Sequence, residues 1–172
     1  ALIAIQQGVA ADWPSWRGPG QTGAGIEKSV VTSWDPGGEN LLWKLNEGGR
    51  TTPIIMDGRV FAIMPVGEGP RSGERVVALD AATGQKVWER RFNVFHTDIV
   101  ENRVGWTALA GDPETGQIYA HATGGELFCF NRDGEQIWKV SMTEELGRIS
   151  GYGGRLHTPI VDEDRVIVSF LN

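Results

Sequence analysis

The side chains best suited to bind a ligand are three arginines that recur ahead of a similar short motif. Arg50, Arg103 and Arg155 each precede a threonine that opens an apolar segment. If the three segments meet in the fold, the guanidinium groups converge on an anion, since clustered cations around a cleft attract negative charge. Ordinary salt bridges and solvated loops are the alternative interpretation. The residues expected near the same site are Trp106, Tyr152 and His157.

The other reactive side chains predict neither a catalytic set nor a metal site. His96 and His121 have no partner at a metal-ligand spacing. Cys129 is the single cysteine and lies in an apolar run, so we expect a buried, unreactive thiol. The acidic run 162–164 is most simply a solvated hairpin turn. We therefore predict no catalytic residue and no metal ligand in this chain.

Two sets of markers indicate that the elements positioning these side chains are repeats. The first is an apolar-Trp-charged triplet that recurs after 45 and then 50 residues. The second is a threonine followed by an apolar run, and it keeps a similar step. The tryptophans are Trp43, Trp88 and Trp138, and the threonines are Thr52, Thr107 and Thr158.

Each repeat predicts four short strands separated by turns that contain glycine. The Asp57-Gly58 dipeptide between two apolar runs is a strong hairpin signal, because its second residue takes positive φ without penalty. One helical turn is expected at 143–148. The predicted strands are 40–46 alone, then 52–56, 59–64, 75–79 and 85–91, then 107–110, 117–122, 126–130 and 135–140, and finally 157–161 and 165–171.

Four strands in about 40–50 residues are typical of a propeller blade. We predict an all-β fold, a fragment of a β-propeller with four-stranded antiparallel blades. The chain accounts for two full blades and parts of others, and the whole ring is expected to have roughly seven or eight blades. A β-sandwich also has many short strands, but it does not predict tryptophans in phase with a repeat.

Residues 78–88 resemble the tryptophan-docking motif of the pyrroloquinoline quinone (PQQ)-like propeller family, Ala-x-Asp-x-x-Thr-Gly-x-x-x-Trp. Asp80 caps the turn, Thr83 bonds nearby backbone and Gly84 supplies positive φ. A shortened copy at 131–134 precedes the next tryptophan, and 12–19 resemble the mature start of exported members. The resemblance covers about residues 12–172 and implies structural docking roles for Ala78, Asp80, Thr83, Gly84, Trp88, Trp138 and Trp43.

The family that the chain resembles includes both enzymes and non-enzymes, so the fold does not decide the function. The family contains quinoprotein alcohol dehydrogenases and the propeller lipoprotein of the outer-membrane assembly machine. We favour a non-catalytic binding or scaffold propeller without a cofactor in this fragment. The alternative is a dehydrogenase dependent on PQQ and calcium, and a propeller sensor fused to another module is a third possibility. The Cys-Cys pair that often covers PQQ in the family is absent here.

Composition and the first residues bear on location and partners. A net charge of −6 without a basic patch argues against a nucleic-acid partner. Residues 1–11 are similar to the end of a secretory signal, with the propeller domain over 12–172. We expect export to the periplasm or cell envelope, no transmembrane span, envelope protein partners and a small anionic ligand at the channel mouth.

Overall fold

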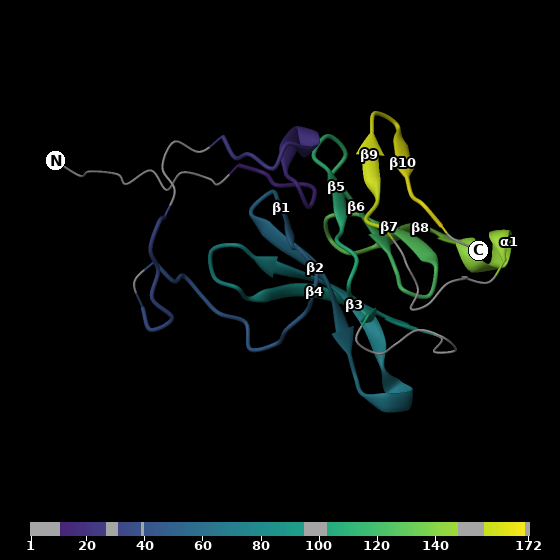
Figure 1. Ribbon diagram of the computed structural model, residues 1–172, viewed down its shortest axis with the longest axis horizontal. Coiled ribbons are helices and arrows are strands. Elements are labelled where there is room, and N and C mark those ends of the chain that lie inside the picture. Colours follow the sequence, from purple (N-terminus) through teal and green to yellow (C-terminus); the bar gives the residue numbers. More distant parts are fainter. Residues whose placement is uncertain (1–10, 27–30, 39, 95–102, 148–156, 171–172) are drawn as a thin grey trace.

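The computed structural model describes residues 11–26, 31–38, 40–94, 103–147 and 157–170. Two four-stranded antiparallel sheets follow one another along the chain and lie side by side (Figure 1). The first contains β1 (Ile54–Met56), β2 (Arg59–Val66), β3 (Gly73–Asp80) and β4 (Lys86–Asn93), in that spatial order. The second contains β5 (Ala110–Asp112), β6 (Gln117–His121), β7 (Glu126–Phe130) and β8 (Gln136–Ser141).

A third, two-stranded sheet follows the second. It pairs β9 (Ile160–Asp162) with β10 (Arg165–Ile167), and β9 lies beside β5 (Figure 1). Three short helical segments complete the described part: η1 (Pro19–Gln21), η2 (Gly69–Arg71) and α1 (Met142–Leu146). The predicted all-β class with four-stranded antiparallel blades is therefore confirmed.

Local sequence explains where the first sheet turns and why its centre is buried. Asp57 and Gly58 both have positive φ, 51° and 68°, so the two-residue turn leaves Met56 opposite Arg59. β3 is buried over nearly its whole length, because a central strand is covered on both faces. The apolar run 76–79 meets that requirement.

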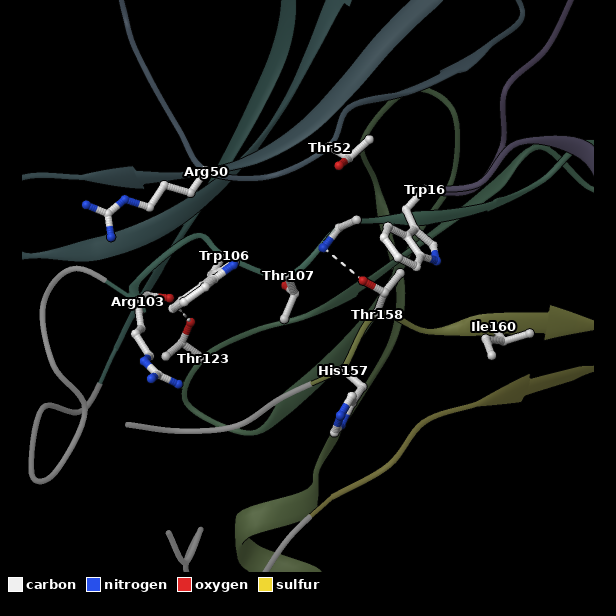
Figure 2. A pocket seen from close by; sticks show the side chains of 11 residues that line it. Trp16, Arg50, Thr52, Arg103, Trp106, Thr107, Thr123, His157, Thr158 and Ile160 are labelled. Atoms are coloured by element: carbon white, nitrogen blue, oxygen red, sulfur yellow. Dashed lines mark hydrogen bonds between the residues drawn. The ribbon is translucent and has the colours of Figure 1, made fainter. Parts of the chain in front are cut away.

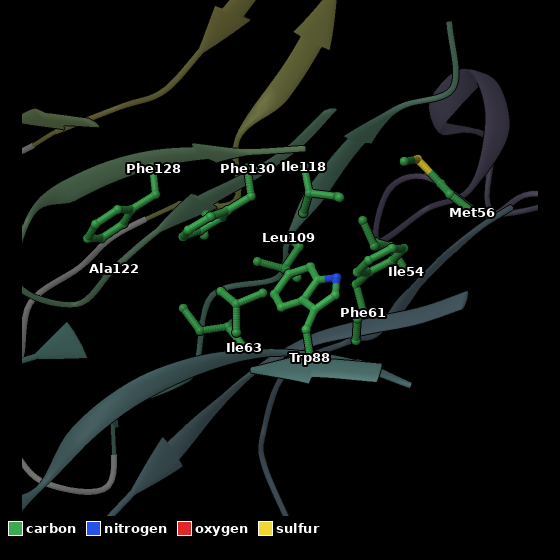
Figure 3. Packing of buried hydrophobic residues seen from close by; sticks show 13 residues of the cluster. Ile54, Met56, Phe61, Ile63, Trp88, Leu109, Ile118, Ala122, Phe128 and Phe130 are labelled. Carbon is green, nitrogen blue, oxygen red and sulfur yellow. The ribbon is translucent and has the colours of Figure 1, made fainter. Parts of the chain in front are cut away.

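The hydrophobic core lies between the two four-stranded sheets (Figure 3). Phe92 of β4 stacks on Phe128 of β7 with ring centroids 4.7 Å apart, and Trp88 contacts aromatic rings of both sheets. A smaller cluster covers the other face of the first sheet. There, Trp43 and Leu45 pack against buried side chains of β2 and β3.

Several predicted boundaries were wrong, and one predicted strand is absent. Residues 40–46 form no strand; this segment covers the first sheet with side chains instead of joining its hydrogen-bond ladder. β2 and β3 extend into the predicted loop as far as Val66 and Gly73, because Pro65 pairs opposite Glu74. β5 begins at Ala110 and not at 107, and β10 ends at Ile167.

The segment 12–16 has a place that its sequence did not predict. Trp13 forms a bridge with Ile55 of β1, with backbone N···O distances of 2.8 and 2.9 Å. The amide of Gly111 in β5 donates to the carbonyl of Pro14 at 2.7 Å. The segment thus joins the first strands of both sheets and holds Trp16 beside them.

Candidate functional site

Two tryptophans each dock on the turn before the last strand of a sheet. The indole Nε1 of Trp88 donates to the carbonyl of Arg132 at 2.8 Å, and Trp43 donates to the carbonyl of Ala81 at the same distance. Each ring lies so close to a glycine that a Cβ there would be 2.5–2.6 Å from it, at Gly84 for Trp43 and at Gly134 for Trp88. Trp88, on the outermost strand of the first sheet, thereby ties that sheet to the second.

The Asp80 carboxylate organises the first of these turns. Its Oδ1 accepts hydrogen bonds from the amide of Thr83 and from its hydroxyl, both at 2.8 Å, and from the amide of Ala82 at 3.1 Å. The hydrogen bonds from Thr83 lower the pKa of Asp80, because they favour its ionised form. Gly84 has φ of 70°, and Ala78, opposite Trp88 in the sheet, is fully buried.

Two ion pairs connect the turn between β1 and β2 crosswise with the turn at 131–134. Arg59 of β2 lies 3.2 Å from Asp133, and Arg132 lies 3.4 Å from Asp57. At least one partner of each pair is largely exposed, so each pair contributes about 0.5 kcal/mol or less. Trp138, which occupies on β8 the position of Trp88 on β4, is half-buried with its ring 5.9 Å from that of Tyr119.

Alanine at Gly84 is expected to lower the free energy of unfolding by about 3 kcal/mol, because it combines an unfavourable φ with overlap of the Trp43 ring. Gly116 is a matched control. It closes a similar turn, in which the Asp112 carboxylate accepts from the hydroxyl of Thr115 and from the amide of Glu114, and it has φ of 71° and faces open space. Gly116→Ala should cost about 1 kcal/mol. Equal losses in urea unfolding would contradict docking as the cause.

A pocket of about 630 Å³ lies where the starts of the repeats meet (Figure 2). Four of the residues predicted to form a binding site line it: Arg50, Arg103, Trp106 and His157. Tyr152, Arg155 and His96 lie outside the described residues, as do residues 1–10 of the predicted signal. The other lining residues are Trp16, Thr52, Thr107, Ala108, Thr123, Thr158 and Ile160.

Threonine hydroxyls hold the three repeat starts side by side. The hydroxyl of Thr51 donates to the carbonyl of Thr107 at 2.7 Å. The next connection runs from the amide of Ala108 to the hydroxyl oxygen of Thr158 at 3.1 Å (Figure 2). Of the three marker threonines, Thr158 therefore uses its hydroxyl to bind the neighbouring repeat start and Thr107 uses its carbonyl, while in the first repeat Thr51 makes the bond instead of Thr52.

Glu74 anchors the pocket from behind and was not singled out from the sequence. This fully buried carboxylate on β3 accepts hydrogen bonds from the amides of Gly105 at 2.6 Å and Thr123 at 2.8 Å, and from the hydroxyl of Thr123. Burial raises the pKa of Glu74 more than these hydrogen bonds lower it. A glutamate at the start of an apolar strand was the only indication in the sequence that Glu74 is buried. Its anchoring role depends on three donors that are distant in the sequence.

Glu74 holds the backbone of the segment 103–106, and two residues of this segment, Arg103 and Trp106, line the pocket. The guanidinium of Arg103 lies over the Trp106 ring at 4.8 Å from the centroid. Gly105 between them has φ of 69°, and a Cβ there would be 2.6 Å from the backbone nitrogen of Pro65. Only glycine fits this approach without strain, so the backbone sets where the Arg103–Trp106 pair lies.

His157 lines the pocket, and the buried His121 lies behind it. His157 Nδ1 is 2.6 Å from the hydroxyl oxygen of Ser169. The Nδ1 of buried His121 lies 3.2 Å from the His157 carbonyl, which can only accept, so this nitrogen carries the proton. Burial lowers the pKa of His121, which favours its neutral form.

The described part of the chain offers neither a metal-ligand cluster nor a membrane-spanning helix. Its His, Cys, Asp and Glu side chains form no group of three or more that could hold a metal ion. Burial raises the pKa of Cys129 to about 11, so this thiol is neutral near pH 7. No helix within the described ranges has the length and apolarity needed to cross a bilayer.

Successive four-stranded antiparallel sheets, locked by docked tryptophans, define this chain as part of a β-propeller. Residues 72–170, more than half of the 172 residues, match the family described as outer membrane protein assembly factor BamB. The chain belongs to this family of PQQ-like propellers, and the predicted resemblance is confirmed. No curated protein matches the sequence significantly.

Solved structures match parts of this chain at low sequence identity. Quinohemoprotein alcohol dehydrogenase from Comamonas testosteroni matches with a TM-score of 0.50 and 22% identity, over 72% of this chain and 17% of its own. A europium-containing methanol dehydrogenase matches at 0.49 and 20%, over 72% and 20%. BamB from Moraxella catarrhalis matches at 0.36 and 14%, over 70% and 41%. The chain thus spans about a fifth of the length of the two dehydrogenases.

Proposed function

We propose that the protein is a non-catalytic binding propeller of the cell envelope, exported to the periplasm, that holds a protein partner at the mouth lined by Arg103 and Trp106. The family match over residues 72–170 carries this proposal, because the family description names an assembly factor. The half-exposed Trp106 supports it further, since exposed aromatic and arginine side chains are frequent anchors of protein interfaces. A small anionic ligand at the same mouth is part of the proposal.

The alternative, a dehydrogenase dependent on PQQ and calcium, fits the described pocket only in part. Arginine and tryptophan side chains suit a flat, carboxylated quinone. Calcium requires several oxygen ligands, usually including carboxylates, and the lining residues within the described part of the chain include no Asp, Glu or Asn. We therefore derive no redox step for this chain.

Site-specific photocrosslinking in intact cells tests the proposal. A photoreactive amino acid at Ile160, which lines the pocket and is 47% exposed, should give a discrete adduct with an envelope protein. The same substitution at Ile137 on β8, 49% exposed and away from the pocket, should not. The adducts are detected by immunoblot of the periplasmic and membrane fractions.

The opposing result is equally specific. If the full-length protein binds PQQ and Ca²⁺ saturably and reduces a dye with alcohols, the dehydrogenase alternative holds and the scaffold proposal fails. Equal crosslinking at both positions would also contradict the proposal, because it would show no preference for the pocket mouth.

A further inference from the structure

The outermost strand of the first sheet has an edge that no described strand covers. β4 is the last strand in the order of that sheet, and its inner edge pairs with β3 over Gly73–Leu79. On its outer edge, the backbone N–H and C=O groups of an eight-residue strand have no partner strand among the described residues. Such an edge can accept another extended segment, which pairs with it through main-chain hydrogen bonds.

Exposed basic side chains lie on both faces of this strand. Arg90 lies on the face toward the second sheet, with its guanidinium over the Trp88 ring at 5.9 Å from the centroid. It forms no ion pair with any described carboxylate. Lys86 and Arg91 lie on the other face, where both pair with Glu89. The strand is therefore basic although the net charge of the chain is −6.

The carboxylates near β4 do not balance these cations. Glu89 accepts hydrogen bonds from the two exposed cations Lys86 and Arg91 and from the buried Arg75, which also pairs with Glu47. Burial of Glu89 opposes its ionisation, but the three hydrogen bonds prevail and lower its pKa to about 2. The carboxylate is thus already shared among several cations, and the edge keeps an excess of positive charge.

We propose that the outer edge of β4 binds an acidic segment of a protein partner, which adds to the first sheet as a further strand. A carboxylate opposite a basic side chain stabilises strand pairing, whereas like charges opposite each other destabilise it. The same rule argues against a second copy as the occupant, because two β4 strands would bring their basic side chains together. None of the described residues that line the pocket comes from β4, so this is a second binding surface beside the proposed mouth.

The outermost strand of the second sheet offers a comparison within the same chain. β8 exposes Ile137 by 49%, and β4 exposes Val87 by 48% at the corresponding position, so the two strands present similar apolar surface. The one basic side chain of β8 is Lys139, which lies 2.8 Å from Glu126. Charge therefore distinguishes the two edges and favours β4 for an acidic strand.

Fluorescence anisotropy with the full-length protein and a labelled peptide of alternating glutamate and valine tests the proposal. The peptide should bind at least about tenfold more tightly than a version with glutamine in place of glutamate. Arg90→Glu should weaken the glutamate peptide about tenfold, and Arg90→Gln should weaken it by less. Lys139→Glu is the matched charge reversal on β8 and should leave the affinity unchanged.

Backbone methylation of the peptide separates strand addition from simple charge attraction. A strand pairs with one edge through the N–H and C=O groups of alternate residues, while those of the residues between them point away. Methyl groups on one alternate set of peptide nitrogens should therefore abolish binding. Methyl groups on the other set should leave the affinity within about threefold of that of the unmodified peptide.

Three outcomes overturn the proposal. The first is equal affinity for the glutamate and glutamine peptides, and the second is equal binding of the two methylated forms. The third is a loss with Lys139→Glu as large as that with Arg90→Glu, because the peptide would then not distinguish β4 from β8. The binding propeller with its partner at the pocket mouth stands or fails separately, by the Ile160 crosslink.

Discussion

Replacing Trp88 with alanine is expected to lower the free energy of unfolding by about 4 kcal/mol. The side chain is 8% exposed and lies between Phe61 and Phe130, with ring centroids 5.9 and 6.2 Å away. Its Nε1 also satisfies the carbonyl of Arg132. The substitution therefore removes a large apolar contact and a hydrogen bond at the boundary between two blades. Urea unfolding of the full-length protein, followed by circular dichroism, measures the loss.

Two further variants separate the contributions of Trp88. Trp88→Phe keeps an apolar ring but removes the donor, and it should cost about 1–2 kcal/mol. Trp34→Ala removes an indole that is 66% exposed and should change stability by less than about 0.5 kcal/mol. A Trp88→Ala loss as small as that of Trp34→Ala would show that the docked ring does not hold the blades together.

The second large effect is expected at Glu74. Glu74→Ala should lower the free energy of unfolding by about 3 kcal/mol, because it leaves the amides of Gly105 and Thr123 and the Thr123 hydroxyl without their acceptor. Glu74→Gln keeps the shape and one acceptor oxygen, so about 1 kcal/mol is expected. The measurement is urea unfolding at a fixed pH. Glu74→Ala should also weaken ligand binding, because Glu74 holds the segment that carries Arg103 and Trp106. An unchanged ligand affinity in this variant would contradict the anchoring role.

The pH dependence of Glu74 provides a sign that can be checked. Burial raises its folded-state pKa above the ordinary value of 4.5, so the folded protein holds this proton more tightly than the unfolded chain. The contribution of Glu74 to stability is therefore complete below pH 4.5 and declines as the pH rises through the folded pKa. The stability of the wild type relative to Glu74→Gln should fall over that interval. A difference that grows with pH would mean that the hydrogen bonds to the carboxylate outweigh the cost of burial.

Tryptophan side chains have different surroundings at the docking turns and in the pocket. Each docked tryptophan packs against a glycine on a neighbouring turn, and its indole N–H donates to a carbonyl of that turn. Trp16 and Trp106 instead keep about half of their surface exposed in a cavity. The same residue type therefore has two uses, which the exposed fraction distinguishes.

Local chemistry made the propeller architecture predictable from the sequence. The repeat is set by tryptophans and threonines at recurring positions, and the Asp57-Gly58 turn is set by the φ preferences of two adjacent residues. The Asp80 turn likewise depends on side chains within four residues of one another. Features of this kind need no knowledge of the rest of the fold. The repeat also led to the prediction that Arg50 and Arg103 lie close together. In the structure both residues line the same pocket.

Tertiary structure decided what long-range contacts control. Residues 40–46 have the composition of a strand, but they form no strand hydrogen bonds. Trp43 and Leu45 of this segment instead cover the apolar face of β2 and β3. Glu74 became an anchor only because Gly105 and Thr123, 31 and 49 residues away, bring three donors to it. Trp16 reaches the pocket through the bridge between Trp13 and Ile55. The sequence thus determined the repeat and its turns, while the packing of distant segments determined the shape and the charge of the pocket, because those depend on which side chains find partners.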